Sequence, residues 1–530
     1  MPTNLKRYTV PTILLAAVAA FTLAACGGSS SGDAESNLAK YMPADAMVYM
    51  EGSVKPEQDV ADNANDIATK LTGTSLSDTL DEALASQDAS SGITYEDDVK
   101  PWLGDNAAMY VAGGVIADPA SLSDTSSMME DASSEDVGLV AESSDVDASQ
   151  AFIQKASEEN KATDGEYEGF DYKVSPDDSS VLGIVDDNVV FATSEDVFKA
   201  MVDASKGDSL EGTSAFSAVS GDAADGSMMN MYVANEPILS ATQQGSGGVD
   251  LNSIYTALGM DLTDTGTLVS LVPKDNEISV VGATNADSTI QSGDASDLIE
   301  SFPANSVFAI GSGDVGANLT RILDAINKEG IEGILKPGEL DKTIQQASQG
   351  LDVPSIIESL QDVGFFVSGD SVGTLGGALV ATTSDPEPLK NTLGVFSSFI
   401  GLAGDAKVKP LGGGLTGFSV RTPELPGRPV VVALQGDRLV VGIGLAASRQ
   451  ALSGKGETLA DNEAYKAAEA SLDGKNVDMF GDPTAIGRLV QEYGDVGGAD
   501  AKEFLGKFQY MVSGSGSEDK TFAFNLGLSD

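Results

Sequence analysis

The stretch "YMPADAMVYMEGS" at residues 41–53 has a counterpart, "SFPANSVFAIGSG", at residues 301–313. In both, Pro and Ala precede an Asp or Asn, and an apolar run typical of a β-strand follows. Three further pairs of similar stretches keep the same order along the chain. They begin at Gly138 and Ala378, at Lys206 and Lys455, and at Asn230 and Val477. This order predicts that the chain arose by duplication of one unit.

Each predicted unit combines hairpins with a few helices. "SSVLGIVDDNVVFAT" from Ser179 and "PVVVALQGDRLVVGI" from Pro429 place an Asp-containing turn between two apolar runs, which is typical of a hairpin. Because hairpins outnumber crossovers, we expect mostly antiparallel pairing. The predicted fold is therefore α+β, with two similar tandem units, each a mostly antiparallel sheet with helices packed on one side.

The ionisable composition excludes several classes of function. The chain has 81 acidic and 30 basic residues, a formal net charge of -51, and no histidine. Without imidazole there is no Ser-His-Asp or Cys-His catalysis and no histidine metal ligand. Strong negative charge opposes binding to nucleic acid, which depends on Lys and Arg. We therefore expect no nucleic-acid partner and a solvated acidic surface.

The amino terminus has the three-part pattern of an export signal. Lys6 and Arg7 precede the apolar run Ile13–Leu23, which is too short to span a bilayer. The run ends in Leu23, Ala24, Ala25 and Cys26, which resemble a bacterial lipobox. The resemblance implies cleavage before Cys26 and attachment of lipid to its thiol. Since this is the only cysteine, the folded part has no disulfide.

These signals predict the following organisation. Residues 1–25 are a lipoprotein signal peptide that is removed, and the small polar residues 26–38 are a flexible tether. Residues 39–286 form the first α+β unit, which contains an acidic, Ser-rich loop at 118–137. Residues 287–300 form a linker, and residues 301–530 form the second unit.

No motif with chemical meaning stands out from the rest of the chain. "GIGLAASRQAL" from Gly442 has the glycine spacing of a dinucleotide site, but the corresponding "FATSEDVFKAM" from Phe191 has no glycine. The acidic stretch Asp59–Asp66 lacks the spacing of a calcium-binding loop. We therefore predict no nucleotide, cofactor, metal or catalytic site.

Three stretches together resemble a known bacterial family. They are the Pro-Ala-Asp strand at Pro43, "WLGDNAAMYVAG" from Trp102, and "GETLADNEAYKAAEASL" from Gly456. The family is secreted and is described only as a domain of unknown function, number thirty-three fifty-two. The second unit departs from the pattern, because Asn305 replaces the Asp and the Trp-Leu-Gly-Asp segment is missing. The resemblance implies neither an activity nor functional residues.

The leading hypothesis is a non-enzymatic binding or scaffold module, anchored by lipid on the outer face of a bacterial cytoplasmic membrane. Its partner is then an unknown envelope protein. A carrier or chaperone for an apolar ligand is a second hypothesis, and it requires an apolar cavity. A hydrolase that depends on carboxylates is a third, and it requires two carboxylates that converge in a cleft.

The lipid attachment gives a direct prediction. Cys26→Ser should release the protein from the membrane fraction and abolish labelling with a fatty-acid probe, because no other residue offers the thiol. Ser29→Ala, in the same tether, should change neither measurement. Membrane retention and labelling of the Cys26→Ser variant would contradict the lipobox.

Overall fold

The computed structural model describes residues 38–76, 78, 93–112, 137–176, 180–236, 239, 255, 259–288, 293–330, 335–348, 351–371, 373–402, 407–412, 415–421, 427–493, 498–516 and 520–529. The chain divides into two compact units. The first unit comprises Met1–Leu251, Leu262–Asn276 and Val280–Ala286. The second comprises Asn252–Asp261, Glu277–Ser279 and Asp287–Asp530.

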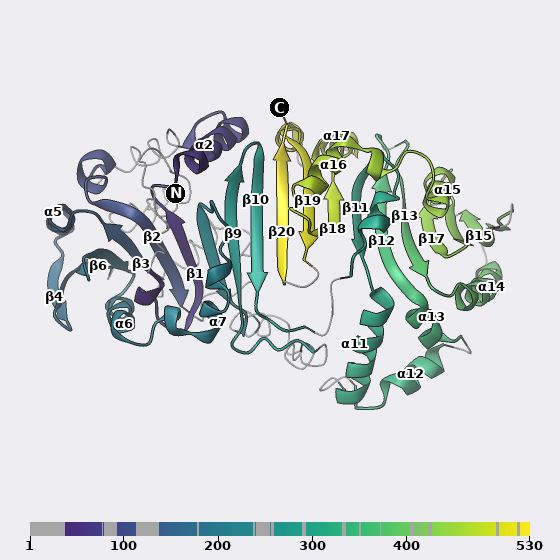
Figure 1. Ribbon diagram of the computed structural model, residues 1–530, viewed down its shortest axis with the longest axis horizontal. Helices are drawn as coiled ribbons and strands as arrows, with labels where there is room; N and C mark the ends of the chain where they lie inside the picture. The colour runs from purple at the N-terminus through teal and green to yellow at the C-terminus, as the bar shows by residue number, and fades with distance from the viewer. Residues whose placement is uncertain are drawn as a thin grey trace, which may run out of the picture. The chain divides into compact units, whose positions relative to one another are not determined.

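The first unit is built mainly from strands, with helices between them (Figure 1). Its strands are β1 (Ala46–Ser53), β2 (Leu103–Ala112), β3 (Val137–Ser143), β4 (Thr163–Tyr167), β5 (Phe170–Val174), β6 (Val181–Val185), β7 (Asn188–Ala192), β8 (Met229–Ala234), β9 (Gly266–Lys274) and most of β10 (Glu277–Thr284). Its helical elements are η1 (Leu38–Tyr41), α2 (Gln58–Thr72), η2 (Tyr95–Val99), α5 (Val146–Asn160), α6 (Glu195–Lys206), η4 (Leu210–Gly212), α7 (Ser214–Ser217) and η5 (Ser220–Asp222).

The second unit has a similar succession of elements. Its strands are β11 (Ser306–Ser312), β12 (Leu360–Ser368), β13 (Gly376–Thr383), β14 (Lys407–Pro410), β15 (Thr416–Arg421), β16 (Val430–Gln435), β17 (Arg438–Ile443), β18 (Asn476–Gly481), β19 (Phe508–Ser515) and β20 (Thr521–Leu528). Its helical elements are α10 (Ser296–Glu300), α11 (Val315–Glu329), α12 (Leu340–Ala347), α13 (Val353–Ser359), α14 (Glu387–Leu402), α15 (Leu445–Ser453), η6 (Leu459–Asp461), α16 (Glu463–Ala470), α17 (Pro483–Tyr493) and α18 (Gly498–Leu505).

Antiparallel pairing follows the same order in both halves of the chain. In the first unit, neighbouring strands run β9, β8, β1, β2, β3, β7, β6, β5, β4. In the second unit they run β19, β18, β11, β12, β13, β17, β16, β15, β14. Each strand of the first order therefore has a positional counterpart in the second.

The prediction that each unit has its own sheet is wrong. The twenty strands belong to one antiparallel sheet, although the α+β character holds. Strand β10 is itself divided, because Glu277–Ser279 belong to the second unit and Val280–Ala286 to the first. An edge strand has unpaired N–H and C=O groups along its backbone. Side-chain patterns do not show which other strand pairs with them. The sequence therefore cannot distinguish one sheet from two.

Local sequence explains the predicted hairpin between β6 and β7. Val185 pairs with Asn188, so that Asp186 and Asp187 form a two-residue turn. Both residues have positive φ, at 48° and 70°, which Asp tolerates better than most residues do. The register of β7 against β6 follows from this turn.

The prediction that helices pack on one side only is also wrong, because helices cover both faces of the first unit. On one face, Phe198, Met201 and Val202 of α6 are buried with Tyr110 and Val140. On the other face, α5 is buried against a second set of strand residues. That set includes Met109, Leu139, Leu182 and Phe191. The strands carry apolar residues in both orientations, so each face needs a cover.

In the second unit, neighbouring phenylalanines on β12 separate the two faces. Phe366 is fully buried in a core formed with α10, α15 and α16. The side chain of Phe365 points to the other face, since successive strand residues alternate, and it is 38% exposed. The two faces of this unit therefore differ in how completely they are covered.

These neighbours provide a matched pair for a stability test. Phe366→Ala should lower the free energy of unfolding by about 3–5 kcal/mol, because it leaves a cavity in a packed core. Phe365→Ala should lower it by about 1 kcal/mol or less, because its side chain is already partly in water. Urea unfolding followed by circular dichroism measures both. Equal losses would show that Phe365 is covered.

Candidate functional site

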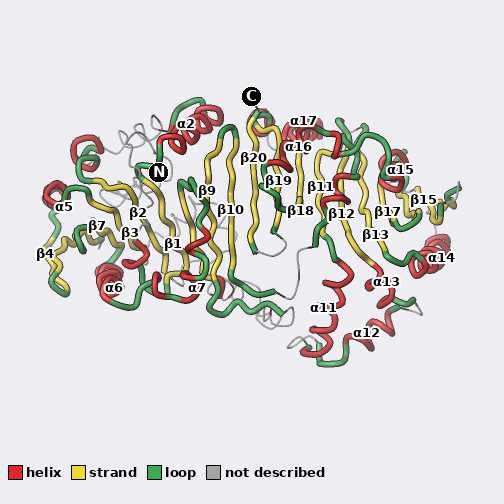
Figure 2. The backbone as a smooth tube through the Cα atoms, in the orientation of Figure 1, coloured by secondary structure: helices red, strands yellow, loops and turns green. Residues whose placement is uncertain are grey.

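A row of apolar side chains crosses four strands of the second unit. Ile310 lies opposite Phe365, Phe365 opposite Leu379, and Leu379 opposite Val441. Residues directly opposite each other in a sheet share a face, so these four form a continuous row. Their exposed fractions are 43%, 38%, 44% and 37% in that order. We refer to the face that carries this row as the open face; its strands lie side by side in Figure 2.

The open face has no charge at its centre. The positions of β11, β12, β13 and β17 that point to it are Phe308, Ile310, Ser312, Val363, Phe365, Val367, Gly377, Leu379, Ala381, Leu439, Val441 and Ile443. None of these side chains is ionisable, and Ile443 is a further exposed member at 40%. In a chain with a net charge of -51, such a surface is unusual. Contiguous exposed apolar surface is typical of interaction sites.

The first unit has a counterpart of this row, but there it is covered. Met50 lies opposite Met109, Met109 opposite Leu139, and Leu139 opposite Phe191. Leu139 and Phe191 are at most 1% exposed. They lie in one core with Trp102 and with Phe152, Ile153 and Ala156 of α5. The same positions of the pairing order are therefore buried in one unit and exposed in the other.

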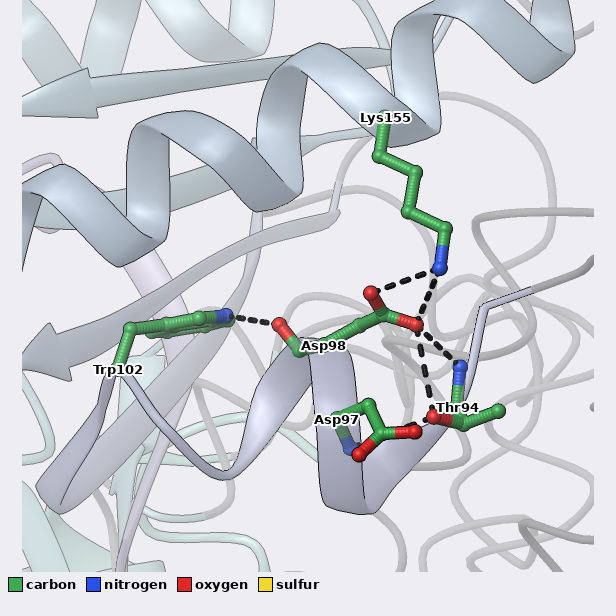
Figure 3. Close-up of polar contacts among 5 residues, drawn as sticks. All are labelled: Thr94, Asp97, Asp98, Trp102 and Lys155. Atoms are coloured by element: carbon green, nitrogen blue, oxygen red, sulfur yellow. Dashed lines mark hydrogen bonds and ion pairs between the residues drawn. The ribbon is translucent and has the colours of Figure 1, made fainter.

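A polar network around Asp98 holds this cover together (Figure 3). Lys155 of α5 donates to both carboxylate oxygens of Asp98, at 2.7 and 2.8 Å. The backbone N–H of Thr94 donates to Oδ2 of Asp98 at 2.8 Å, and the indole N–H of Trp102 donates to the Asp98 backbone carbonyl at 2.8 Å. The centroids of the Trp102 and Phe152 rings are 5.3 Å apart. Asp98 thus ties the η2 turn to α5 directly above the covered row.

The pKa of the Asp98 carboxyl is lower than its ordinary value. Burial acts to raise this pKa, but the hydrogen bonds from Lys155 and from the Thr94 backbone, with the charge of Lys155, outweigh that effect. Asp98 is therefore a carboxylate at neutral pH, and its ion pair with Lys155 is intact. We refer to this network of Thr94, Asp98, Trp102 and Lys155 as the latch, because it holds η2 against α5.

The second unit has no such latch in its described residues, and its helices lie elsewhere. The segment that precedes β12 is α13, which contains no tryptophan, and α11 packs against the junction of α13 and β12. Gly316 permits this approach, because a Cβ there would clash with the carbonyl oxygens of Ile357 and Leu360. Figures 1 and 2 show α11 and α12 beyond the ends of β11 and β12.

The described buried side chains of helix α14 pack beside the row. Its residues Leu389 and Leu393 are buried with Phe418, Val420 and Leu434, which belong to β15 and β16. These strands flank the row rather than form it. Among the side chains that the structure describes, those of α14 therefore cover the strands beside the open face.

The residues predicted for lipid attachment lie outside the described part of the chain. This holds for Cys26 and for the flanking Leu23, Ala24 and Ala25. The predicted acidic loop is also outside it, except for Val137, which begins β3. Among the described helices, none is long and apolar enough to cross a membrane.

The other motifs singled out in the sequence have structural explanations. Gly442 lies one residue before the end of β17, where a Cβ would clash with Ser448 of α15 and lie tightly against Ala378 of β13. Asp59–Asp66 lie within α2. Within the described ranges, no three acidic side chains are arranged to hold a metal ion.

Sequence patterns alone did not identify the open face. Phe365, Leu379 and Val441 have the same apolar character as their buried counterparts in the first unit. The one available signal was the missing Trp-Leu-Gly-Asp segment in the second unit, since Trp102 belongs to the cover of the first. That segment is noticeable in the sequence, but its covering role is visible only in the structure.

Comparison with known proteins gives a family. The family model described as "Protein of unknown function (DUF3352)" matches residues 9–480. The chain belongs to this family. Comparison with curated proteins gives no match. The solved structure titled "Structure of crystal form I of TP0453" is 14% identical and covers 49% of this chain and 81% of its own, with a TM-score of 0.24. A score this low carries no argument.

The latch predicts a pH-dependent contribution to stability. The lowered pKa means that the Asp98 ion pair stabilises the fold above the ordinary carboxyl pKa, near 4, and that this stabilisation is lost as the pH falls through the folded value. Asp98→Asn should therefore lower the free energy of unfolding by on the order of 1–2 kcal/mol at pH 7. In urea unfolding, its difference from the unmodified protein should shrink below about pH 4.

The neighbouring Asp97→Asn is the matched control, because only the backbone of Asp97 takes part in the network, through its N–H to Thr94. It should have a much smaller effect at pH 7. A difference between Asp98→Asn and the unmodified protein that does not change with pH would contradict the electrostatic role of Asp98.

Proposed function

We propose that the protein is a non-enzymatic binding module of the bacterial cell envelope, anchored through a lipid on Cys26 at the extracytoplasmic face of the membrane. Its working surface is the open face of the second unit. The observation that carries the proposal is the row from Ile310 to Val441, which is exposed although its counterpart in the first unit is buried.

The chemistry of the open face supports binding through apolar contact. Burial of a Leu, Ile or Phe side chain is worth about 1.5–3 kcal/mol, and aromatic anchors dominate many interfaces. Phe365 lies between Ile310 and Leu379, so an aromatic ring sits at the centre of an aliphatic surround. Such a surface gains free energy from any partner that excludes water from it.

The amino-terminal signals support the proposed location. The charged start, the short apolar run and the small residues before Cys26 occur in the order of a lipoprotein signal. The small polar residues that follow are suited to a tether between lipid and folded units. An anchored module then meets its partner within the envelope.

Cross-linking from a defined position tests the proposal. Phe365 is replaced by the photoreactive analogue benzoylphenylalanine in the full-length protein, and cells are irradiated. We expect a discrete cross-linked product, because the ring at this position faces the bound partner. The product is identified by mass spectrometry.

Phe504 provides the matched control, because it is a 51% exposed phenylalanine on α18, outside the four strands that form the open face. The analogue at position 504 should give no such product. Absence of a product from position 365, or the same product from both positions, would refute the open face as the working surface.

A further inference from the structure

Three methionines lie side by side on one face of the strands in the first unit. Met50 of β1 lies directly opposite Met109 of β2 on one side and Met231 of β8 on the other. Residues opposite each other in a sheet share a face, and their Cβ atoms are about 4.5–5.5 Å apart. All three side chains pack in the same apolar cluster. Three thioether sulfurs therefore come from adjacent positions of one face.

These methionines are packed but still within reach of solvent. Met109 is 6% exposed, whereas Met50 and Met231 are partly buried at the margin of the cluster. A methionine side chain has three rotatable bonds, so the two outer sulfurs can turn toward the central one. The sulfurs are thus accessible to a small ion from one side and surrounded by apolar side chains on the other.

Gly52 leaves space beside the three methionines. It follows Met50 by two residues on β1, so that both positions point to the same face, and it lies opposite Met229 of β8. Apart from the chain neighbours of Gly52, a Cβ added there would have one described atom within 4 Å, the backbone oxygen of Met228 at 3.6 Å. No described side chain of another strand or helix fills this space, and Met229 brings a fourth thioether next to it.

The pairing of the strands does not require sulfur at these positions. In the second unit, the equivalent positions of β18, β11 and β12 carry Met479, Ile310 and Phe365. β-Branched and aromatic side chains are the types that strands favour, and they satisfy the same pairing order there. Three adjacent methionines in the first unit therefore need an explanation other than strand geometry.

Thioether sulfur is a soft, uncharged metal ligand. Soft sulfur ligands select Cu(I), whereas hard cations such as Mg²⁺ prefer carboxylates and water. Most of the acidic excess of the chain lies in the first unit, and the resulting negative field attracts cations to it. The field does not distinguish one cation from another, so the thioethers supply the selectivity.

From these observations we infer that Met50, Met109 and Met231 form a binding site for Cu(I), with the ion held over β1 beside Gly52. The ion is bound without a change in its oxidation state, and no proton is released, because a thioether carries none. The site lies in the first unit. It goes beyond the proposed function and does not depend on the open face.

Titration with silver(I), a soft ion that resembles Cu(I) and is stable in air, tests the inference. The full-length protein with Cys26→Ser is used throughout, because a free thiol at the only cysteine would itself bind silver. Isothermal titration with silver nitrate in a chloride-free buffer should show one saturable site. A large excess of Mg²⁺ should not displace the silver, since Mg²⁺ prefers oxygen ligands.

Substitutions by leucine remove one sulfur each and nearly conserve apolar volume. Met50→Leu and Met231→Leu should each weaken silver binding at least about tenfold. Met479→Leu is the matched control, because it changes the position of the second unit that is equivalent to Met231, and it should leave the affinity unchanged. Circular dichroism establishes that each variant is folded.

Nuclear magnetic resonance of isotope-labelled methionine methyl groups locates the bound ion. Silver should shift the methyl signals of Met50, Met109 and Met231, assigned from leucine variants, and leave the signal of Met479 in place. No saturable binding of silver, equal binding by Met50→Leu and Met231→Leu, or shifts confined to other methionines would overturn the inference. These outcomes concern the methionine site alone, whereas the cross-link from position 365 concerns the open face alone.

Discussion

Apolar residues in both orientations of the strands are the constraint on which the rest of the structure depends. A strand that is polar on alternate positions needs one cover, but β2 and β12 carry large apolar side chains toward both faces. Each face must then be packed against helices or leave apolar surface in water. The first unit covers both faces. The second covers one face fully and leaves the centre of the other exposed.

The cover over the row in the first unit includes a small polar network. Asp98 joins Lys155, Thr94 and Trp102, and so links a turn, a helix and an indole above Leu139. Because the Asp98 side chain is only 13% exposed, its charge requires these partners. In the second unit, Gly316 brings α11 to the start of β12 instead. The described part of the second unit thus places helix α11, rather than a tryptophan-bearing turn, next to the start of β12.

The sequence predicts some features of the fold and of the open face but not others. Turn chemistry predicts the hairpin at Asp186, and Asp145, whose side chain accepts the Ala148 N–H, marks the start of α5. Such features depend on residues close in the chain. Whether the strands form one sheet or two, and whether Leu379 is covered, depends on distant elements. Phe365 and Phe366 are the same residue type at neighbouring positions, and only the position of the helices makes one exposed and the other buried.

Burial of the four exposed side chains of the row would release free energy that the fold itself does not gain. Full burial of a large apolar side chain is worth about 1.5–3 kcal/mol, so four side chains that are about two-fifths exposed each retain on the order of 1 kcal/mol. In the first unit, α5 and Trp102 use the equivalent surface to stabilise the fold itself. Because all strands of the open face are already paired, only side-chain contacts remain for a partner. A partner that binds this face, as we propose, therefore does so through apolar side chains whose shape fits the row.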